Sequence, residues 1–340
     1  MSIPTREFGK TGEKVSSIGY GGMGLAAFYG EPAPQSTVDA ILDKCLANGV
    51  TFWDTADMYS PVKSRRLGYN EEQFGAYFKS HPEARSKVFL ATKFVNRVKE
   101  NGERFLDGSP EWCHQACNDS LRRLGVDQID LYYAHRSDPN VNVTETVRAM
   151  KELKDQGKIR YIGVSEYNLE QLEAANKVAH IDAIQIEISP LTPEALTNGI
   201  LAWAEKNGTA LVAYSPLGRG FMTGQYKSVE DFDEDDYRRF SPRFQGENFQ
   251  KNLELVSKIK KIADKKSATA GQIALAWVLQ KSPIIIPIPG TKKEKYLDEN
   301  INSVHVKLSD ADVAEIDDVI NSFEVSGTRY APESMKVCAF

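Results

Sequence analysis

Short apolar runs alternate with amphipathic segments along almost the whole chain. The apolar runs are rich in β-branched and aromatic residues, which is typical of buried strands, whereas the amphipathic segments repeat apolar positions as one face of a helix does. Strands are expected at residues 17–24, 50–54, 88–93, 129–135, 159–165, 183–187, 210–214 and 284–288. Helices are expected at residues 36–48, 70–79, 109–124, 143–156, 169–178, 194–207, 249–264, 269–280, 292–302 and 309–323.

This order of elements predicts the α/β class and, within it, a (β/α)8 TIM barrel with extra helices. No linker rich in Pro, Gly or Ser interrupts the chain, so we expect residues 1–340 to form a single domain, with an open doubly wound sheet as the alternative. Three segments lie outside the repeating units: an N-terminal hairpin at residues 6–15, a polar segment at 215–247 and an aperiodic C-terminal tail at 321–340. The polar segment is either a lid or a solvated loop.

Composition narrows the classes of protein to consider. The chain has 340 residues, of which 41% are hydrophobic, enough for a large buried core. Its formal net charge of −5 gives no electrostatic reason to expect a nucleic acid or an anionic membrane as partner. The sequence shows neither a signal-like apolar N-terminus nor a membrane-length apolar run, so a cytoplasmic location is expected. The four cysteines do not have the spacing of a metal-binding motif, so no metal site is expected. The sequence leaves the oligomeric state open.

Polar residues that could take part in catalysis lie at the ends of successive strands. Asp54, Lys93 and His135 end the second, third and fourth strands, and Tyr59 follows in the loop after Asp54. In a parallel barrel the carboxyl ends of all strands meet at one mouth. Each residue alone has an ordinary interpretation: a turn-capping carboxylate, a solvated lysine, a buried histidine. Their joint placement with a tyrosine favours a catalytic site.

These residues and their spacing resemble the aldo-keto reductase family, and most of all its fungal and plant branch with a long loop after the seventh strand. The segment Leu121–Tyr132 is similar to the family's helix-to-strand signature, and Ile288–Lys292 is similar to its cofactor loop. The resemblance implies NADPH-dependent reduction of aldehydes or ketones by hydride transfer. It assigns the catalytic roles to Asp54, Tyr59, Lys93 and His135, with Tyr59 as the proton donor.

The resemblance also implies a bound NADPH or NADP, with NADH less expected. Ser165 and Gln185 would bind the nicotinamide carboxamide, and Tyr214 would stack on the ring. Glu166 is a departure, because many family members carry asparagine there. The remaining residues that the resemblance assigns to the cofactor, from pyrophosphate to adenine, are Ser215, Leu217, Arg219, Gly290, Thr291, Lys292, Lys293, Glu299 and Asn300.

The chemistry of these side chains agrees with carbonyl reduction. A tyrosine has a pKa of about 10, and a neighbouring Lys93 ammonium favours the phenolate while Asp54 orients the lysine. His135 either steers the carbonyl oxygen as a neutral donor or assists proton transfer when charged. The helix that begins near Lys292 and Lys293 offers backbone N–H groups to a phosphate, and either lysine could select a 2′-phosphate; the alternative is a solvated lysine face.

Other interpretations stay open. Tyr29, Phe94, Arg136 and the tail from Ser322 are expected to line an aromatic pocket for a small-molecule carbonyl substrate. Lys93 could instead form a Schiff base, as in barrel aldolases, although pairing with Asp54 would make it a poor nucleophile. The resemblance also extends to regulatory subunits that bind the cofactor with little turnover.

Overall fold

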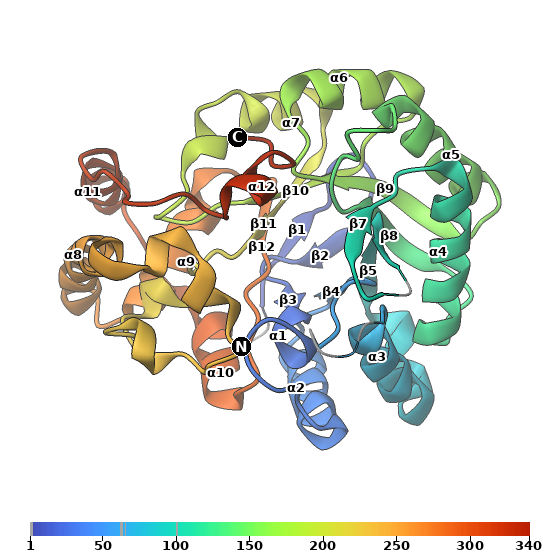
Figure 1. Ribbon diagram of the computed structural model, residues 1–340. Coiled ribbons are helices and arrows are strands. Elements are labelled where there is room, and N and C mark those ends of the chain that lie inside the picture. Colours follow the sequence, from blue (N-terminus) through green and yellow to red (C-terminus); the bar gives the residue numbers. More distant parts are fainter. Residues whose placement is uncertain (1–2, 62–63, 65, 100) are drawn as a thin grey trace.

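Eight parallel strands form the centre of the molecule, and helices lie outside them (Figure 1). The computed structural model describes residues 3–61, 64, 66–99 and 101–340. Neighbouring strands follow the order in which they occur along the chain, each connected to the next by a crossover. The strands are β3 (Tyr20–Gly21), β4 (Phe52–Asp54), β5 (Phe89–Phe94), β8 (Ile129–Ala134), β9 (Ile159–Ser165), β10 (Ala183–Glu187), β11 (Ala210–Tyr214) and β12 (Ile285–Pro287).

Backbone hydrogen bonds join the first and last strands and close the sheet. The N–H of Gly19 donates to the carbonyl of Pro287 at 2.9 Å, and the N–H of Gly21 donates to that of Pro289 at 3.2 Å. The predicted (β/α)8 barrel is therefore confirmed, and the open sheet is wrong. Close approach at this seam requires glycine, because a Cβ on Gly290 would lie 2.3 Å from the carbonyl oxygen of Gly21.

The helices begin and end where local signals place them. At α4, for example, the Ser109 hydroxyl accepts a hydrogen bond from the N–H of Trp112 at 3.2 Å, and Gly125 ends the helix with φ 65°. The α-helices are α1 (Met23–Ala26), α2 (Gln35–Ala47), α3 (Tyr69–Ser80), α4 (Pro110–Leu124), α5 (Val143–Asp155), α6 (Leu169–Val178), α7 (Ile200–Asn207), α8 (Gly246–Lys265), α9 (Ala270–Lys281), α10 (Glu294–Asn302), α11 (Asp310–Asn321) and α12 (Pro332–Met335). Short 3-10 turns are η2 (Pro82–Lys87), η3 (Glu194–Leu196) and η8 (Ser303–His305).

The N-terminal hairpin closes one end of the barrel. Its strands β1 (Thr5–Glu7) and β2 (Lys14–Ser16) pair antiparallel, as the glycine-rich turn between them predicts. Phe8 follows β1 and packs against Phe52 and Phe89, the first residues of β4 and β5, with ring centroids 5.7 and 4.8 Å apart. The amino ends of the strands are thus covered by apolar side chains, which leaves the carboxyl ends for chemistry.

Three local features differ from the expected elements. The helix expected at 194–207 is divided into η3 and α7, because Gly199 has φ 99° between them. An additional hairpin of β6 (Asn96–Val98) and β7 (Arg104–Leu106) follows β5. The four-residue helix α1 follows β3 directly, where none was expected.

The segment 215–247 is packed against the rest of the chain. It contains η4 (Phe221–Thr223), η5 (Val229–Asp231), η6 (Tyr237–Phe240) and η7 (Pro242–Phe244). Phe221, Phe232 and Phe244 are buried and cluster with Phe249 of α8. The backbone of Tyr237 also donates to the carbonyl of Phe28, at 2.9 Å, beyond α1. These contacts exclude a merely solvated loop.

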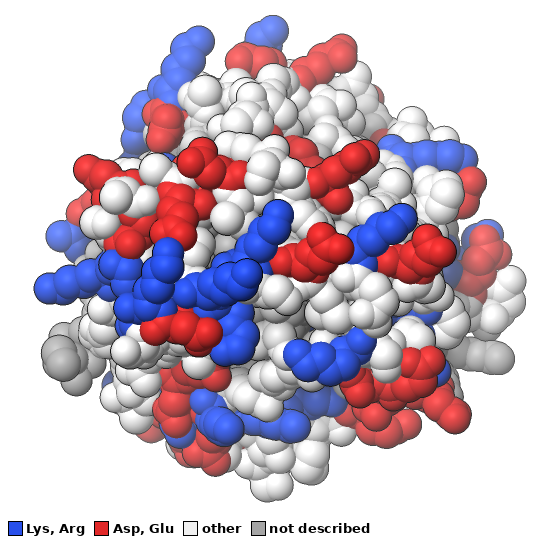
Figure 2. Space-filling view, turned by 90° about the vertical axis from the view of Figure 1, so that its left-hand side faces the viewer, with Lys and Arg blue, Asp and Glu red and all other residues white. Residues whose placement is uncertain are grey.

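The outer face around α8, α10 and α11 carries positive and negative side chains close together (Figure 2). Between α8 and α11, for instance, Lys265 pairs with Glu315 at 2.7 Å. In the described part of the chain, none of the helices has the length and apolar character needed to cross a bilayer.

The glycine seam gives a test of barrel closure. We expect Gly290→Ala to lower the free energy of unfolding by about 1–3 kcal/mol, because the new methyl group forces β3 and the loop after β12 apart. Urea unfolding followed by circular dichroism measures the change. Gly24→Ala is the matched control, since its Cβ would meet only the Tyr29 ring, at 3.5 Å; equal effects of the two substitutions would contradict the close approach.

Candidate functional site

Four side chains from separate parts of the chain meet at the carboxyl end of the barrel. Asp54 ends β4, Lys93 lies near the end of β5, His135 follows β8, and Tyr59 lies in the loop after β4. The rings of Tyr59 and His135 meet edge to face with centroids 5.8 Å apart. The structure thus brings together all four residues that the strand ends singled out.

The Lys93 ammonium is the centre of this cluster. Its Nζ donates to Asp54 Oδ1 at 2.5 Å, to the Thr55 carbonyl at 2.8 Å and to the Tyr59 hydroxyl at 3.1 Å. These three acceptors match the three donors of an ammonium group. Lys93 is fully buried, so this cation depends on the protein alone for its hydrogen bonds.

Burial controls the protonation of the cluster. Burial raises the pKa of Asp54 and lowers the pKa of Lys93, and their contact opposes both shifts. Burial and the Asp54 carboxylate raise the pKa of Tyr59 well above its usual range, which is opposite to the lowering expected from Lys93 alone. Burial, Lys93 and Arg136 hold the pKa of His135 well below its usual range. The site therefore presents a neutral phenol and a neutral imidazole.

Ser165, Gln185 and Tyr214 lie at the ends of the next strands around the mouth. Gln185 Nε2 donates to Asp54 Oδ2 at 2.7 Å, so the amide expected at the nicotinamide holds the second carboxylate oxygen of Asp54. The Tyr214 hydroxyl donates to Glu166 Oε1 at 2.8 Å. Gln185 thus ties the end of β10 to the cluster, and Tyr214 ties the end of β11 to the residue that follows β9.

A tight turn follows β11 and exposes backbone N–H groups. Ser215 and Arg219 both have positive φ, 47° and 59°. Within the described residues, the N–H groups of Leu217 and Arg219 donate to no acceptor. The N–H of Gly218 between them donates to the Ser215 carbonyl at 2.8 Å, which holds the turn in place. Free N–H groups in such a turn are suited to an anion.

The loop from Gly290 to Lys293 holds the other residues expected at the cofactor. The Thr291 carbonyl accepts from the Tyr20 hydroxyl at 2.8 Å. Lys292 Nζ donates to the carbonyls of Tyr29 and Glu31, at 2.8 and 3.1 Å, whereas Lys293 is exposed. At the far end of this region, Glu299 accepts from the Thr269 hydroxyl at 2.6 Å, and Asn300 is buried in α10.

The comparisons with known proteins agree with this geometry. Residues 17–321 match the model of the Aldo/keto reductase family. The chain belongs to the aldo-keto reductase family. It is 46% identical to the NADP(+) aldo-keto reductase yakc of Schizosaccharomyces pombe over 98% of this chain and 96% of that one. It is 43% identical to the aldo-keto reductase str7 of Strobilurus tenacellus over 97% and 96%. The glycerol dehydrogenase of Gluconobacter oxydans has a similar structure, with a TM-score of 0.83 at 27% identity, covering 98% of this chain and 99% of that one.

Glu166 anchors the C-terminal tail of this aldo-keto reductase. Arg329 binds both of its carboxylate oxygens, at 3.0 and 3.1 Å, and the N–H of Ala339 donates to Oε2 at 3.0 Å. Arg329 also donates to the Phe340 carbonyl at 2.5 Å. The buried Glu166 carboxylate is therefore neutralised by a residue from the tail.

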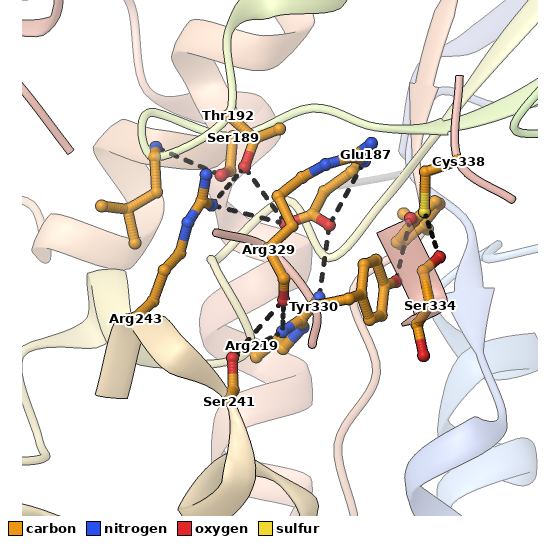
Figure 3. Close-up of polar contacts among 12 residues, drawn as sticks. Glu187, Ser189, Thr192, Arg219, Ser241, Arg243, Arg329, Tyr330, Ser334 and Cys338 are labelled. Atoms are coloured by element: carbon orange, nitrogen blue, oxygen red, sulfur yellow. Dashed lines mark hydrogen bonds and ion pairs between the residues drawn. The ribbon is translucent and has the colours of Figure 1, made fainter. Parts of the chain in front are cut away.

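A second carboxylate, Glu187 at the end of β10, extends this network into the 215–247 segment (Figure 3). Arg219 lies 3.4 Å from Glu187 and donates to the carbonyl of Arg329 at 2.8 Å. The Tyr330 hydroxyl lies 3.0 Å from that of Tyr214. The tail thus crosses the mouth between the ends of β9 and β11, and the 215–247 segment supports it.

The three residues expected to line the substrate pocket lie in different places. Phe94 is on the face of β5 opposite Lys93 and stacks on Tyr132 at 5.0 Å, away from the mouth, because neighbouring residues of a strand point to opposite faces. Tyr29 lies beneath Arg238, whose Cζ is 4.7 Å from the ring. Only Arg136 lies beside the cluster, next to His135.

Sequence reasoning missed three residues that hold this region together: Arg329, Tyr330 and Asn96. The last lies 3.4 Å from Nδ1 of His135 and comes from the unexpected hairpin. The usable signal was Glu166, because a carboxylate in place of a buried amide requires a cation nearby. Its partner lies 163 residues away in an aperiodic tail, so no local pattern pointed to it.

We expect Glu166→Gln to free the C-terminal tail. A neutral amide cannot balance the buried Arg329 guanidinium, so amide hydrogen exchange of residues 326–340 should become at least about tenfold faster, since breaking a buried pair is strongly destabilising. Exchange measured by mass spectrometry tests this. Glu333→Gln, which removes only an exposed pair with Lys336, is the control. Unchanged exchange in Glu166→Gln would contradict the anchoring role.

The same anchor should depend on pH. Burial opposes the charge of Glu166, but Arg329 and Arg136 outweigh it and lower its pKa. A carboxylate with a lowered pKa in the folded protein stabilises at any pH above its unfolded value, and this contribution is lost as the pH falls through the lower value. Tail exchange, corrected for intrinsic rates, should therefore stay slow at neutral pH and accelerate below about pH 4.

Proposed function

We propose that this chain reduces aldehydes or ketones to alcohols with NADPH, and that Tyr59 gives the proton. The observation that carries the proposal is the chain of contacts from Asp54 through Lys93 to the Tyr59 hydroxyl, beside His135, at the carboxyl end of the barrel. Relatives named as NADP(+) aldo-keto reductases support the choice of cofactor.

The residues at the mouth fit a dinucleotide. The free N–H groups of Leu217 and Arg219 suit a pyrophosphate, and exposed Lys293 at the start of α10 suits a further phosphate. When bound, the cofactor would supply the hydride, which no protein side chain can do. Tyr214, with its ring at the end of β11, would lie beside the nicotinamide.

The cluster would act on the carbonyl oxygen. As negative charge develops there, the Tyr59 hydroxyl donates its proton, and the Lys93 ammonium stabilises the phenolate that remains. The raised pKa of Tyr59 does not prevent this step, since an alkoxide is a stronger base than a phenolate. The neutral imidazole of His135 would orient the oxygen by donating a hydrogen bond.

The contacts of Lys93 weigh against a Schiff-base aldolase. All three donors of the ammonium are engaged and its partner Asp54 is buried with it. A lysine nucleophile must instead present a free amine to its substrate.

We expect Tyr59→Phe to lower kcat for a generic aldehyde by about 10²–10⁴-fold, because only the proton donor is removed. NADPH oxidation followed at 340 nm, about the absorbance maximum of reduced nicotinamide, gives the rate. Tyr132→Phe is the matched control, since the buried Tyr132 hydroxyl has no hydrogen-bond partner among the described residues and lies outside the mouth. Full activity of the Tyr59→Phe variant would refute the role of Tyr59 as proton donor. If the unaltered protein bound NADPH tightly but reduced no aldehyde, it would instead be a regulatory subunit.

Lys293 is the expected selector of the 2′-phosphate, because Lys292 is already bonded to two carbonyls. We expect Lys293→Met to raise the Kd for NADPH by about tenfold through loss of one charge-assisted contact, with the Kd for NADH unchanged. Titration of protein fluorescence with each nucleotide measures both constants. Lys295→Met, two residues further along α10, is the control; a parallel loss of affinity for NADH would show that Lys293 does not read the 2′-phosphate.

A further inference from the structure

Arg136 is a cation at the mouth that forms no ion pair with a carboxylate among the described residues, although Glu166 lies near enough to favour its charge. Arg219, Arg243 and Arg329 all lie within 4.0 Å of a carboxylate, whereas Arg136 has no such partner in the described parts of the chain. Its only hydrogen bonds there come from Nη1, which donates to the His135 carbonyl at 2.7 Å and to the Ser165 hydroxyl at 3.2 Å. The Nε and Nη2 donors are left for a ligand.

The two hydrogen bonds fix the guanidinium between the ends of β8 and β9. This position is next to His135, whose ring touches that of Tyr59. Arg136 is only partly exposed, so water compensates its charge incompletely. Electrostatic effects agree with the placement. Burial acts to lower the pKa of Arg136, and Tyr214, Tyr330 and Glu166 outweigh it and raise that pKa. Burial raises the pKa of Tyr59, and Arg136 opposes that rise.

A planar guanidinium with two free donors has a preferred ligand. Arginine binds carboxylates through two parallel N–H···O bonds, which fixes both position and orientation. The guanidinium lies between Tyr214 and Tyr330 of the mouth and the catalytic cluster with Tyr59 and His135, so a carbonyl substrate at the cluster would come close to it. The hydrogen bonds of the Lys93 cluster do not involve Arg136.

We propose that Arg136 selects carbonyl substrates that carry a carboxylate a short distance from the reacting carbon, such as aldehyde acids or oxo acids. This inference rests on the proposed function, since it names the substrate class of the same site. Arg136 would bind the carboxylate while Tyr59 and His135 contact the carbonyl oxygen. A neutral substrate of the same shape would leave the guanidinium without a partner.

The test compares charged and neutral forms of one molecule. 4-Carboxybenzaldehyde is paired with methyl 4-formylbenzoate, and 4-oxobutanoate with its methyl ester, so that a rigid and a flexible spacing are both covered. The intrinsic reactivities of acid and ester differ, so the quantity compared is the acid-to-ester ratio of kcat/KM in the unaltered protein divided by that in the variant. Any general damage to folding or cofactor binding cancels in this double ratio.

We expect Arg136→Met to lower the acid-to-ester ratio by about 10- to 100-fold for at least one pair, the range for a charge-assisted hydrogen bond. Arg136→Lys, which keeps the charge but loses the two-pronged geometry, should keep part of the preference. Arg148→Met on the exposed face of α5 is the matched control and should leave the ratio unchanged. A ratio that Arg136→Met leaves unaltered for both pairs would overturn the inference.

A binding measurement separates this inference from the proposed function. Isothermal titration of the protein with NADP present should show that benzoate binds more tightly than benzamide, and that Arg136→Met removes the difference. If no aldehyde is reduced but benzoate binding still depends on Arg136, the proposed reaction fails and the anion site stands. If neutral aldehydes are reduced while benzoate and benzamide bind equally, the reaction stands and the anion site fails. A loss of NADPH affinity alone in Arg136→Met would assign the residue to the cofactor and overturn its role in substrate selection.

Discussion

The organisation of the mouth depends on one buried ammonium group. Lys93 is removed from water completely, and an isolated charge in such a place would be lost by deprotonation or would unfold the site. It is retained because Asp54, the Thr55 carbonyl and Tyr59 together satisfy its three donors. Because Lys93 lies on β5 and two of its acceptors, Thr55 and Tyr59, lie in the loop after β4, these hydrogen bonds hold that loop against β5. They thereby set the position of the Tyr59 phenol.

The same rule, applied to Glu166, accounts for the C-terminal tail. A buried carboxylate at the end of β9 must find a cation, and Arg329 provides it from the tail. The cost of burying each charge is offset by its partner, so the ion pair helps to hold the segment that carries Arg329 across the mouth. Apolar residues of the tail, among them Phe323 and Phe340, also pack against the core. The single residue Glu166 is therefore coupled to the placement of a whole segment. The 215–247 segment contacts the same tail through Arg219, which donates to the carbonyl of Arg329.

Sequence patterns predicted what is periodic and local. The bounds of β10 and β11 agree with the expected strands residue for residue, because continuous apolar runs between turn signals define a buried parallel strand. The hairpin β6–β7 was missed, since it is partly exposed and has little apolar alternation. The Asp54, Tyr59, Lys93 and His135 cluster followed from topology, because the barrel brings strand ends together whatever their separation along the chain. Contacts of the tail and the protonation of Tyr59 depend on burial and long-range pairing, which no local pattern encodes.

Net charge averaged over the chain conceals a local surplus at the mouth. The sequence as a whole is acidic, and the face around α8, α10 and α11 mixes both signs, as expected of a surface without a polyanionic partner. Inside the mouth charges are partly or fully buried and interact more strongly, and in the ion-pair network described above cations outnumber carboxylates. Among these cations Arg136 forms no ion pair within the described residues, so an anion bound beside it would gain from its charge. A phosphorylated dinucleotide and an acidic substrate would both supply such an anion. The cations are Lys93, Arg136, Arg219, Arg243 and Arg329, and the carboxylates are Asp54, Glu166 and Glu187.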